Sequence, residues 1–141
     1  MKRLLGVLLL LAACKHPNTA TALTGAETPK AAVQAFLAAA RAEDLQAMSA
    51  VWGTEKGPAR DQLDAAQFEK RELILICHFK ADSDRILSEG PSERGERMLR
   101  VALTKRGLTR ETKFFTVLGP SKRWYVVNAN LDQVKDFCRG G

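Results

Sequence analysis

The chain has 141 residues, of which 45% are hydrophobic and 27% are charged, with 22 basic against 16 acidic side chains. These fractions lie close to the averages of soluble proteins and exclude a disordered chain, a collagen-like repeat and a polytopic membrane protein. The length leaves room for one globular domain. The basic excess lies in residues 81–141, which hold twelve basic and eight acidic groups.

The amino terminus has the pattern of a secretory signal. Lys2 and Arg3 precede an apolar run over residues 4–13, and a polar segment begins at Lys15. A helix that spans the hydrocarbon core of a bilayer needs about twenty apolar residues, and this run is about half as long. The run therefore predicts export of the chain and not a transmembrane helix.

The signal ends in Leu11-Ala12-Ala13-Cys14. This sequence resembles the lipobox of bacterial lipoproteins, in which the cysteine is acylated and becomes the first residue after cleavage. The resemblance implies a signal peptide over residues 1–13, a lipid on Cys14 that holds the protein on a membrane, and a flexible tether over residues 14–27. Such lipoproteins commonly stay in the inner membrane when aspartate follows the cysteine, so Lys15 implies outer-membrane attachment facing the periplasm where the host has two membranes. An ordinary signal peptide with an incidental cysteine is the alternative.

Cys77 and Cys138 remain once Cys14 carries a lipid. An even pair in an oxidising compartment favours a disulfide, which would stabilise the fold by about 4 kcal/mol for a closed loop of about sixty residues. Two buried free thiols are the alternative. The spacing of the two cysteines excludes a CxxC redox pair. A zinc site is excluded because His78 is the one histidine of the domain, which leaves too few ligands.

The first half of the domain has helical patterns. Thr28 and Pro29 predict the start of a helix over 29–42, and Asp44 caps a second short helix that ends at Gly53 and the Gly57-Pro58 pair. Residues 60–80 favour one long helix, although the apolar run LILICHF within them also suits a buried strand.

After Asp82 the pattern changes to a period of two. Turn signals predict four strands of an antiparallel meander with one buried face, over 84–89, 96–105, 108–118 and 122–129. Asn130 then caps a closing helix over 131–138, which brings Cys138 towards the third helix. The fold class is therefore α+β, with helices first and a run of antiparallel strands after them.

This order resembles the nuclear transport factor 2-like, or SnoaL-like, superfamily, over about residues 28–130. TPKAAVQAFLAAARAEDLQAMSAVWG is similar to its opening helix pair, and RWYVVNAN to its last strand. The resemblance implies a domain over 28–141 in which N-terminal helices pack in a curved, cone-shaped four-stranded sheet. The chain also resembles small lipoproteins with a cysteine in helix three and another in a closing element, here Phe137-Cys138.

Enzymes of this superfamily, such as ketosteroid isomerase, place Asp, His or Tyr inside the cone as general acid and base. His78 can serve as a base with Asp82 or Asp84 orienting it, and Tyr125 can polarise a carbonyl if it points inward. A histidine bonded to the backbone and a tyrosine packed among aromatics are the simpler interpretations. Asp44 is explained as a helix cap and Asp64 as a solvated helical charge.

Two further sets of residues are candidates for binding. The first consists of aromatic side chains that either line a ligand pocket or fill the core: Phe36, Trp52, Phe79, Phe115 and Trp124. The second consists of basic side chains that we expect to form a stripe on the sheet, either solvated or facing an anionic lipid surface or acidic partner: Arg100, Lys105, Arg106, Arg110, Lys113, Lys122 and Arg123.

The sequence carries no catalytic constellation, no cofactor motif and no nucleic-acid recognition motif. We therefore expect a membrane-tethered, non-enzymatic binding or protein-interaction module. The alternative is a small-molecule enzyme or carrier that uses the cone interior, of the isomerase, dehydratase or cyclase type. Dimerisation through the sheet is common among proteins of this resemblance.

Overall fold

Helix α1 spans Pro29–Ala42 in the computed structural model, which describes residues 23–139. Its start is set locally, as expected, because the Thr28 hydroxyl accepts a hydrogen bond from the Ala31 amide at 3.0 Å. Pro29 stands at the first helical position, where its missing amide proton costs no helical bond. The helix buries one stripe of side chains, which includes Val33, Phe36, Leu37 and Ala40.

Helix α2 (Leu45–Val51) is capped by Asp44, whose carboxylate accepts from the Ala47 amide at 3.0 Å. The chain then forms a hairpin of two short strands, β1 (Gly53–Thr54) and β2 (Gly57–Pro58), where we expected only the end of a helix. A Cβ on Gly53 would clash with the carbonyl oxygen of Gly57, so the hairpin requires glycine at that position.

Helix α3 spans Ala65–Phe79 and includes the LILICHF run, in agreement with the helical interpretation. It starts five residues later than the expected boundary at 60. Asp64 is exposed, as expected of a solvated charge, but it stands at the N-cap of the helix, where it accepts from the Gln67 amide at 3.0 Å. The residues just before it form a short 3₁₀ helix, Ala59–Asp61.

Four strands form one antiparallel sheet in the order β3-β4-β5-β6. Their bounds are Ser83–Pro91, Arg97–Lys105, Leu108–Leu118 and Trp124–Ala129. This meander and the α+β class agree with expectation. Strand β3 is longer than the expected 84–89, because Gly90 and Pro91 pair with Met98 and Arg97 instead of forming the turn. A proline is tolerated there because β3 is an edge strand.

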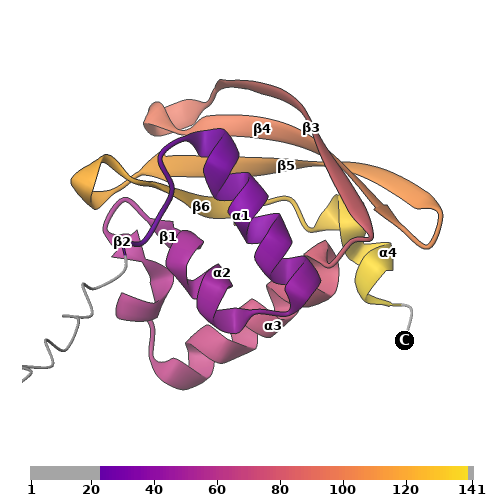
Figure 1. Ribbon diagram of the computed structural model, residues 1–141, viewed down its shortest axis with the longest axis horizontal. Coiled ribbons are helices and arrows are strands. Elements are labelled where there is room, and N and C mark those ends of the chain that lie inside the picture. Colours follow the sequence, from indigo (N-terminus) through magenta and orange to yellow (C-terminus); the bar gives the residue numbers. More distant parts are fainter. Residues whose placement is uncertain (1–22, 140–141) are drawn as a thin grey trace, which may run out of the picture.

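The helices lie on one side of the sheet, with α1 running along its face (Figure 1). The core between them is aromatic at its centre, where the rings of Phe36, Phe79 and Phe114 meet with centroids 4.9 to 5.8 Å apart. Strand β4 contributes the alternating residues that its pattern predicts, namely Leu99, Val101 and Leu103, all fully buried.

The chain closes with a 3₁₀ turn (Asp132–Val134) and helix α4 (Lys135–Cys138), in place of the continuous helix expected over 131–138. The Asn130 side chain caps this segment by accepting from the Asp132 amide at 3.1 Å. Cys138 is bonded to Cys77 of α3, with the two Cα atoms 4.9 Å apart, so the expected disulfide is present.

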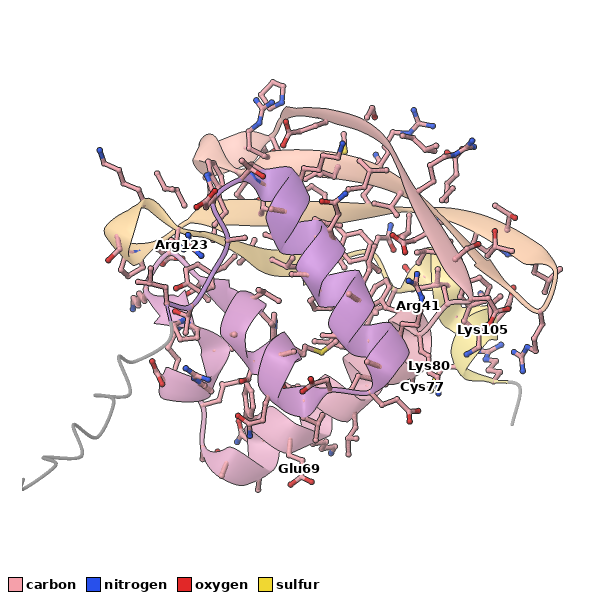
Figure 2. The ribbon with its side chains drawn as sticks, viewed as in Figure 1. Arg41, Glu69, Cys77, Lys80, Lys105 and Arg123 are labelled. Carbon is pink, nitrogen blue, oxygen red and sulfur yellow. A yellow bond between two sulfur atoms is a disulfide. The ribbon has the colours of Figure 1, made fainter. Side chains whose placement is uncertain are left out.

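Residues 24–26, which we expected to belong to the tether, pack against β6. Ala26 is only 8% exposed and forms a bridge with Trp124. Arg123 donates to the carbonyl oxygens of Thr24 and Gly25 at 3.1 and 3.0 Å, beside the start of this segment (Figure 2). The folded body therefore includes residues before Thr28.

The signal peptide over residues 1–13 and the lipidation site Cys14 lie outside the described residues. Within residues 23–139, no helix has the length and apolar character needed to cross a bilayer.

Candidate binding pocket

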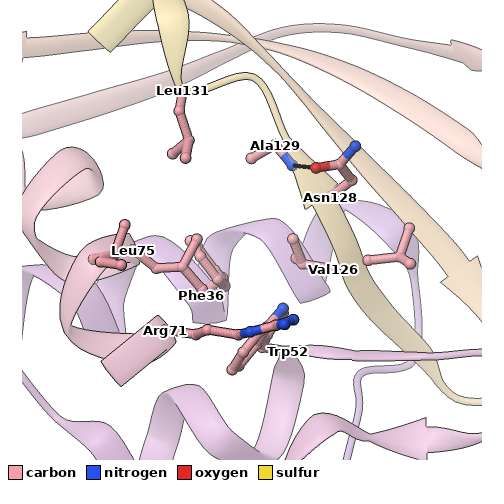
Figure 3. Close-up of a pocket in the computed structure, with 10 residues that line it drawn as sticks. Phe36, Trp52, Arg71, Leu75, Val126, Asn128, Ala129 and Leu131 are labelled. Carbon is pink, nitrogen blue, oxygen red and sulfur yellow. Dashed lines mark hydrogen bonds between the residues drawn. The ribbon is translucent and has the colours of Figure 1, made fainter. Parts of the chain in front are cut away.

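A cavity of about 260 Å³ lies between α3 and β6 (Figure 3). Its walls come from α1, α3, β6 and the residues that follow α2 and β6. The lining residues are Phe36, Trp52, Arg71, Ile74, Leu75, Val126, Val127, Asn128, Ala129 and Leu131. The volume lies just below the 300 to 1,000 Å³ that is typical of small-molecule sites, so the cavity suits a small or narrow ligand.

Local structure explains why these residues meet. Arg71, Ile74 and Leu75 are spaced three and four apart, which places them on one flank of α3. On the opposite wall, the pairing of β5 with β6 shifts register at Val127, which is an extra residue between two partnered positions. Such a bulge turns successive side chains of the strand towards the same space.

The lining is apolar apart from two side chains. Arg71 reaches from α3 towards Trp52 at one edge of the cavity (Figure 3). Asn128 stands on β6, and its side-chain oxygen accepts from the Ala129 amide at 2.9 Å. No aspartate or glutamate belongs to the lining.

The expected pocket residues divide between the cavity and other places. Phe36 and Trp52 line the cavity, and Trp52 also stacks on Phe68 at 5.5 Å. Phe79 does not line it, because its ring is enclosed in the aromatic core. Trp124 packs on the edge of the core, outside the cavity.

Phe115 is the one residue of that set on the wrong face of the sheet. Strand β5 alternates, and its neighbour Phe114 points into the core with no exposed surface. Phe115 pairs with Met98 and Asn128 on the opposite face. Which of the two adjacent phenylalanines faces the core depends on the register of the strand, because a shift of one residue moves every side chain to the other face of the sheet.

His78 contacts the backbone of its own helix. Its Nδ1 atom lies 2.8 Å from the Ile74 carbonyl oxygen, one turn back on the same helix, and it does not line the cavity. Asp84, one of its expected partners, forms an ion pair with Arg41 instead. Asp82, the other, accepts from the Arg106 amide at 2.9 Å.

Tyr125 also lies away from the cavity. It is 2% exposed, and its hydroxyl lies 2.6 Å from the Thr24 hydroxyl. Its ring packs so closely on Gly25 and Gly119 that neither position has room for a Cβ. Tyr125 therefore anchors the segment before α1 and does not reach this cavity.

The expected basic stripe is divided between two faces of the sheet and several partners. Lys105 turns towards α4, where its Nζ donates to the Phe137 carbonyl at 2.8 Å (Figure 2), and burial together with the nearby Arg106 lowers its pKa. Arg110 pairs with Asp136 at 3.2 Å. Arg100 pairs with Glu111 at 2.7 Å. Arg123 is bound to the segment before α1, as described above.

Glu72 is a buried acid that the sequence analysis did not single out. It is 2% exposed, and its Oε1 atom has no hydrogen-bond partner. Burial, with a smaller contribution from Glu69, raises its pKa to about 7. Its spacing from Ile76 and Phe79 places it on the face of the helix that points to the core. A glutamate at such a position is nevertheless normally expected to be exposed to solvent, because glutamate is rarely buried.

Comparisons with protein-family models, with curated proteins and with solved structures found no match. Within residues 23–139, no group of three histidine, cysteine, aspartate or glutamate side chains is placed to hold a metal ion. The geometry of the site is that of an apolar cavity with one cationic side chain, Arg71, at its edge.

Proposed function

We propose that this chain is a lipid-anchored lipoprotein of the bacterial envelope and that it binds a small apolar molecule in the cavity between α3 and β6, without catalysing a reaction on it. The observation that carries the proposal is the apolar lining, which contains no carboxylate, histidine or tyrosine. General acid–base catalysis needs such a group within hydrogen-bond reach of the substrate. Binding needs only shape, apolar area and a few polar contacts.

The fold supports the finer assignment to the nuclear transport factor 2-like superfamily. Helices come first, a four-stranded meander follows, and a cavity opens between a helix and the last strand. In this proposal the sheet and helices form the cone of that superfamily, and the cavity is its interior.

The anchor is tested by Cys14→Ser. If the LAAC sequence is a lipobox, the wild-type protein is recovered in the membrane fraction and takes up a labelled fatty acid, because acyl chains contribute about 0.8 kcal/mol per buried methylene. The variant is expected in the soluble fraction without label. A wild-type protein that lacks the label, and a variant that still fractionates with membranes, would together contradict the anchor.

The pocket is tested by filling it. Ala129 lines the cavity at the end of β6, so Ala129→Phe places a ring where the ligand would lie. The matched control is Ala102→Phe, which adds the same ring to β4 between the buried Val101 and Leu103, and so on the opposite face of the sheet. Binding is followed with N-phenylnaphthylamine, an apolar probe whose fluorescence rises out of water.

The wild type and Ala102→Phe are expected to bind the probe alike, and Ala129→Phe to bind it at least about tenfold more weakly, a loss of about 1.4 kcal/mol. Circular dichroism verifies that both variants are folded. Equal binding by the two variants would place the probe elsewhere and contradict the proposed pocket.

A further inference from the structure

The polar groups of the cavity offer hydrogen-bond donors and no ionised acceptor. Arg71 carries five N–H donors. Asn128 pairs with Phe115 on the outer face of the sheet, and its side-chain oxygen accepts from the Ala129 amide, so it offers the cavity no free acceptor. With no acid in the lining, the site is complementary to a ligand group that accepts hydrogen bonds and carries negative charge.

Arg71 differs from several other arginines of the protein in having no partner. Arg41, Arg100 and Arg110 each form an ion pair with a carboxylate, and Arg123 is bound to carbonyl oxygens. Within residues 23–139, Arg71 makes no hydrogen bond or ion pair, although its helix brings it to the cavity edge. An exposed guanidinium beside an apolar cavity is therefore free to bind an anion.

The remaining lining determines the rest of the ligand. Ile74, Leu75, Val126 and Leu131 form aliphatic walls next to the guanidinium, so a charged group and a hydrocarbon chain must be adjacent in the ligand. The volume of about 260 Å³ limits that chain to a short or narrow one. One guanidinium matches a single negative charge, whereas a phosphate monoester carries about −1.5 to −2.

We propose that the cavity binds a short aliphatic carboxylate, with its chain between α3 and β6 and its carboxylate on Arg71. The inference rests on the proposed binding function and adds the class of the ligand. The guanidinium fork is suited to this role because it can bind both oxygens of a carboxylate at once.

The test compares three ligands of equal chain length, namely decanoate, decanol and decylamine, on the full chain. Trp52 lines the cavity and is one of the two tryptophans of the sequence, so the background substitution Trp124→Phe leaves it as the only tryptophan reporter. The test variant is Arg71→Gln. The matched control is Lys70→Gln, which removes the same charge from the next residue of α3, outside the cavity lining.

Decanoate is expected to bind about tenfold more tightly than decanol, and decylamine more weakly than either. Arg71→Gln should weaken decanoate about tenfold and leave decanol unchanged, and Lys70→Gln should change neither by more than about twofold. Vesicles of phosphatidylglycerol form a further arm, and binding to them is expected to be independent of Arg71.

The following results would overturn the inference. Decanol that binds as tightly as decanoate would show that the charge is not recognised, while the cavity itself would remain a binding site. Equal losses of decanoate affinity in Arg71→Gln and Lys70→Gln would assign the effect to the overall electrostatic field of the protein and not to a contact with Arg71. Vesicle binding that is lost in Arg71→Gln while decanoate binding is retained would assign the residue to lipid headgroups.

The naphthylamine probe separates failure of this inference from failure of the proposed function. If the probe binds the wild type and no decyl compound does, the ligand class alone is wrong. If the probe also fails to bind, the proposed function is wrong as well.

Discussion

Glu72 is the residue whose environment departs most from its sequence class. Side chains at spacings of three and four on α3 face the core, and Glu72 stands in that row with Ile76 and Phe79, all buried. A buried carboxylate without a partner is costly when it is ionised, so the proton is retained to higher pH. Its pKa of about 7, against an ordinary value of 4.5, has burial as the main cause and repulsion from Glu69 as the second.

This pKa predicts how stability depends on pH. Below pH 4.5 the group is protonated in both the folded and the unfolded chain, so it has no effect. Between 4.5 and about 7 the folded chain holds a proton that the unfolded chain has lost, so stability falls as the pH rises. Above about 7 both states are ionised, and the full penalty, on the order of 3 kcal/mol, is present.

Glu72→Gln should therefore leave the free energy of unfolding nearly unchanged at pH 4.5 and raise it progressively towards pH 8, by up to about 3 kcal/mol. Urea unfolding at several pH values measures the difference. Glu55→Gln, at an exposed position in the turn between β1 and β2, is the control and should shift stability by less than about 0.5 kcal/mol at any pH. A Glu72→Gln effect that is independent of pH would refute the buried ionisation.

At this scale, what the sequence could predict was local. Thr28 and Asp44 were identified as caps because a cap depends on amides two or three residues away. The partner of Tyr125 is Thr24, which is 101 residues away in the chain and belongs to the supposed tether. Asp64 was placed inside a helix because residues 60–63 have helical composition, whereas the chain forms a separate 3₁₀ helix over Ala59–Asp61 and α3 begins at Ala65.

Among the elements, α4 is the one held by a covalent bond. It has four residues, too few to be stable alone. It is attached by the buried Phe137, by polar contacts from Lys105 and Arg110, and by the disulfide from Cys138 to Cys77. The bond closes a loop across a sequence separation of 61 residues. In the chain-entropy model such a loop contributes about 4 kcal/mol by restricting the unfolded chain.

The double substitution Cys77→Ser/Cys138→Ser is expected to lower the free energy of unfolding by about 4 kcal/mol relative to the oxidised wild type. Reduction of the wild type should lower it by nearly the same amount, because both changes release the same loop. Guanidinium unfolding with and without reductant makes the comparison. If reduction had no effect on the unfolding midpoint, the non-covalent contacts of α4 would be sufficient to hold it.

The elements themselves were largely predictable, and their irregularities were not. Period-two alternation located the strands of the sheet to within a few residues, because one buried face imposes it. The bulge at Val127 depends on how β6 pairs with β5, and no residue pattern within β6 indicates it. The β1–β2 hairpin is two residues per strand, too short to produce a pattern, yet it leads into the cavity wall through Trp52.

For the molecule as a whole, element order predicted the α+β class, because helices followed by consecutive strands have few ways to bury both apolar faces. The cavity was not predictable in the same way. It is the space left where α1, α3 and β6 do not close on one another, and it depends on the sum of many packing contacts. Two of its residues, Phe36 and Trp52, were expected from their apolar character, whereas Arg71 was not singled out because an exposed arginine on a helix is ordinary.

The measurement that tests the account most directly is a crystal structure of the protein grown with decanoate. We predict electron density for one chain between α3 and β6, ending within hydrogen-bond distance of the Arg71 guanidinium, with Phe36 and Trp52 in contact with the hydrocarbon. Collapse of Leu75 and Leu131 into the cavity, with no density between them at saturating decanoate, would contradict the claim that this cavity is a binding site.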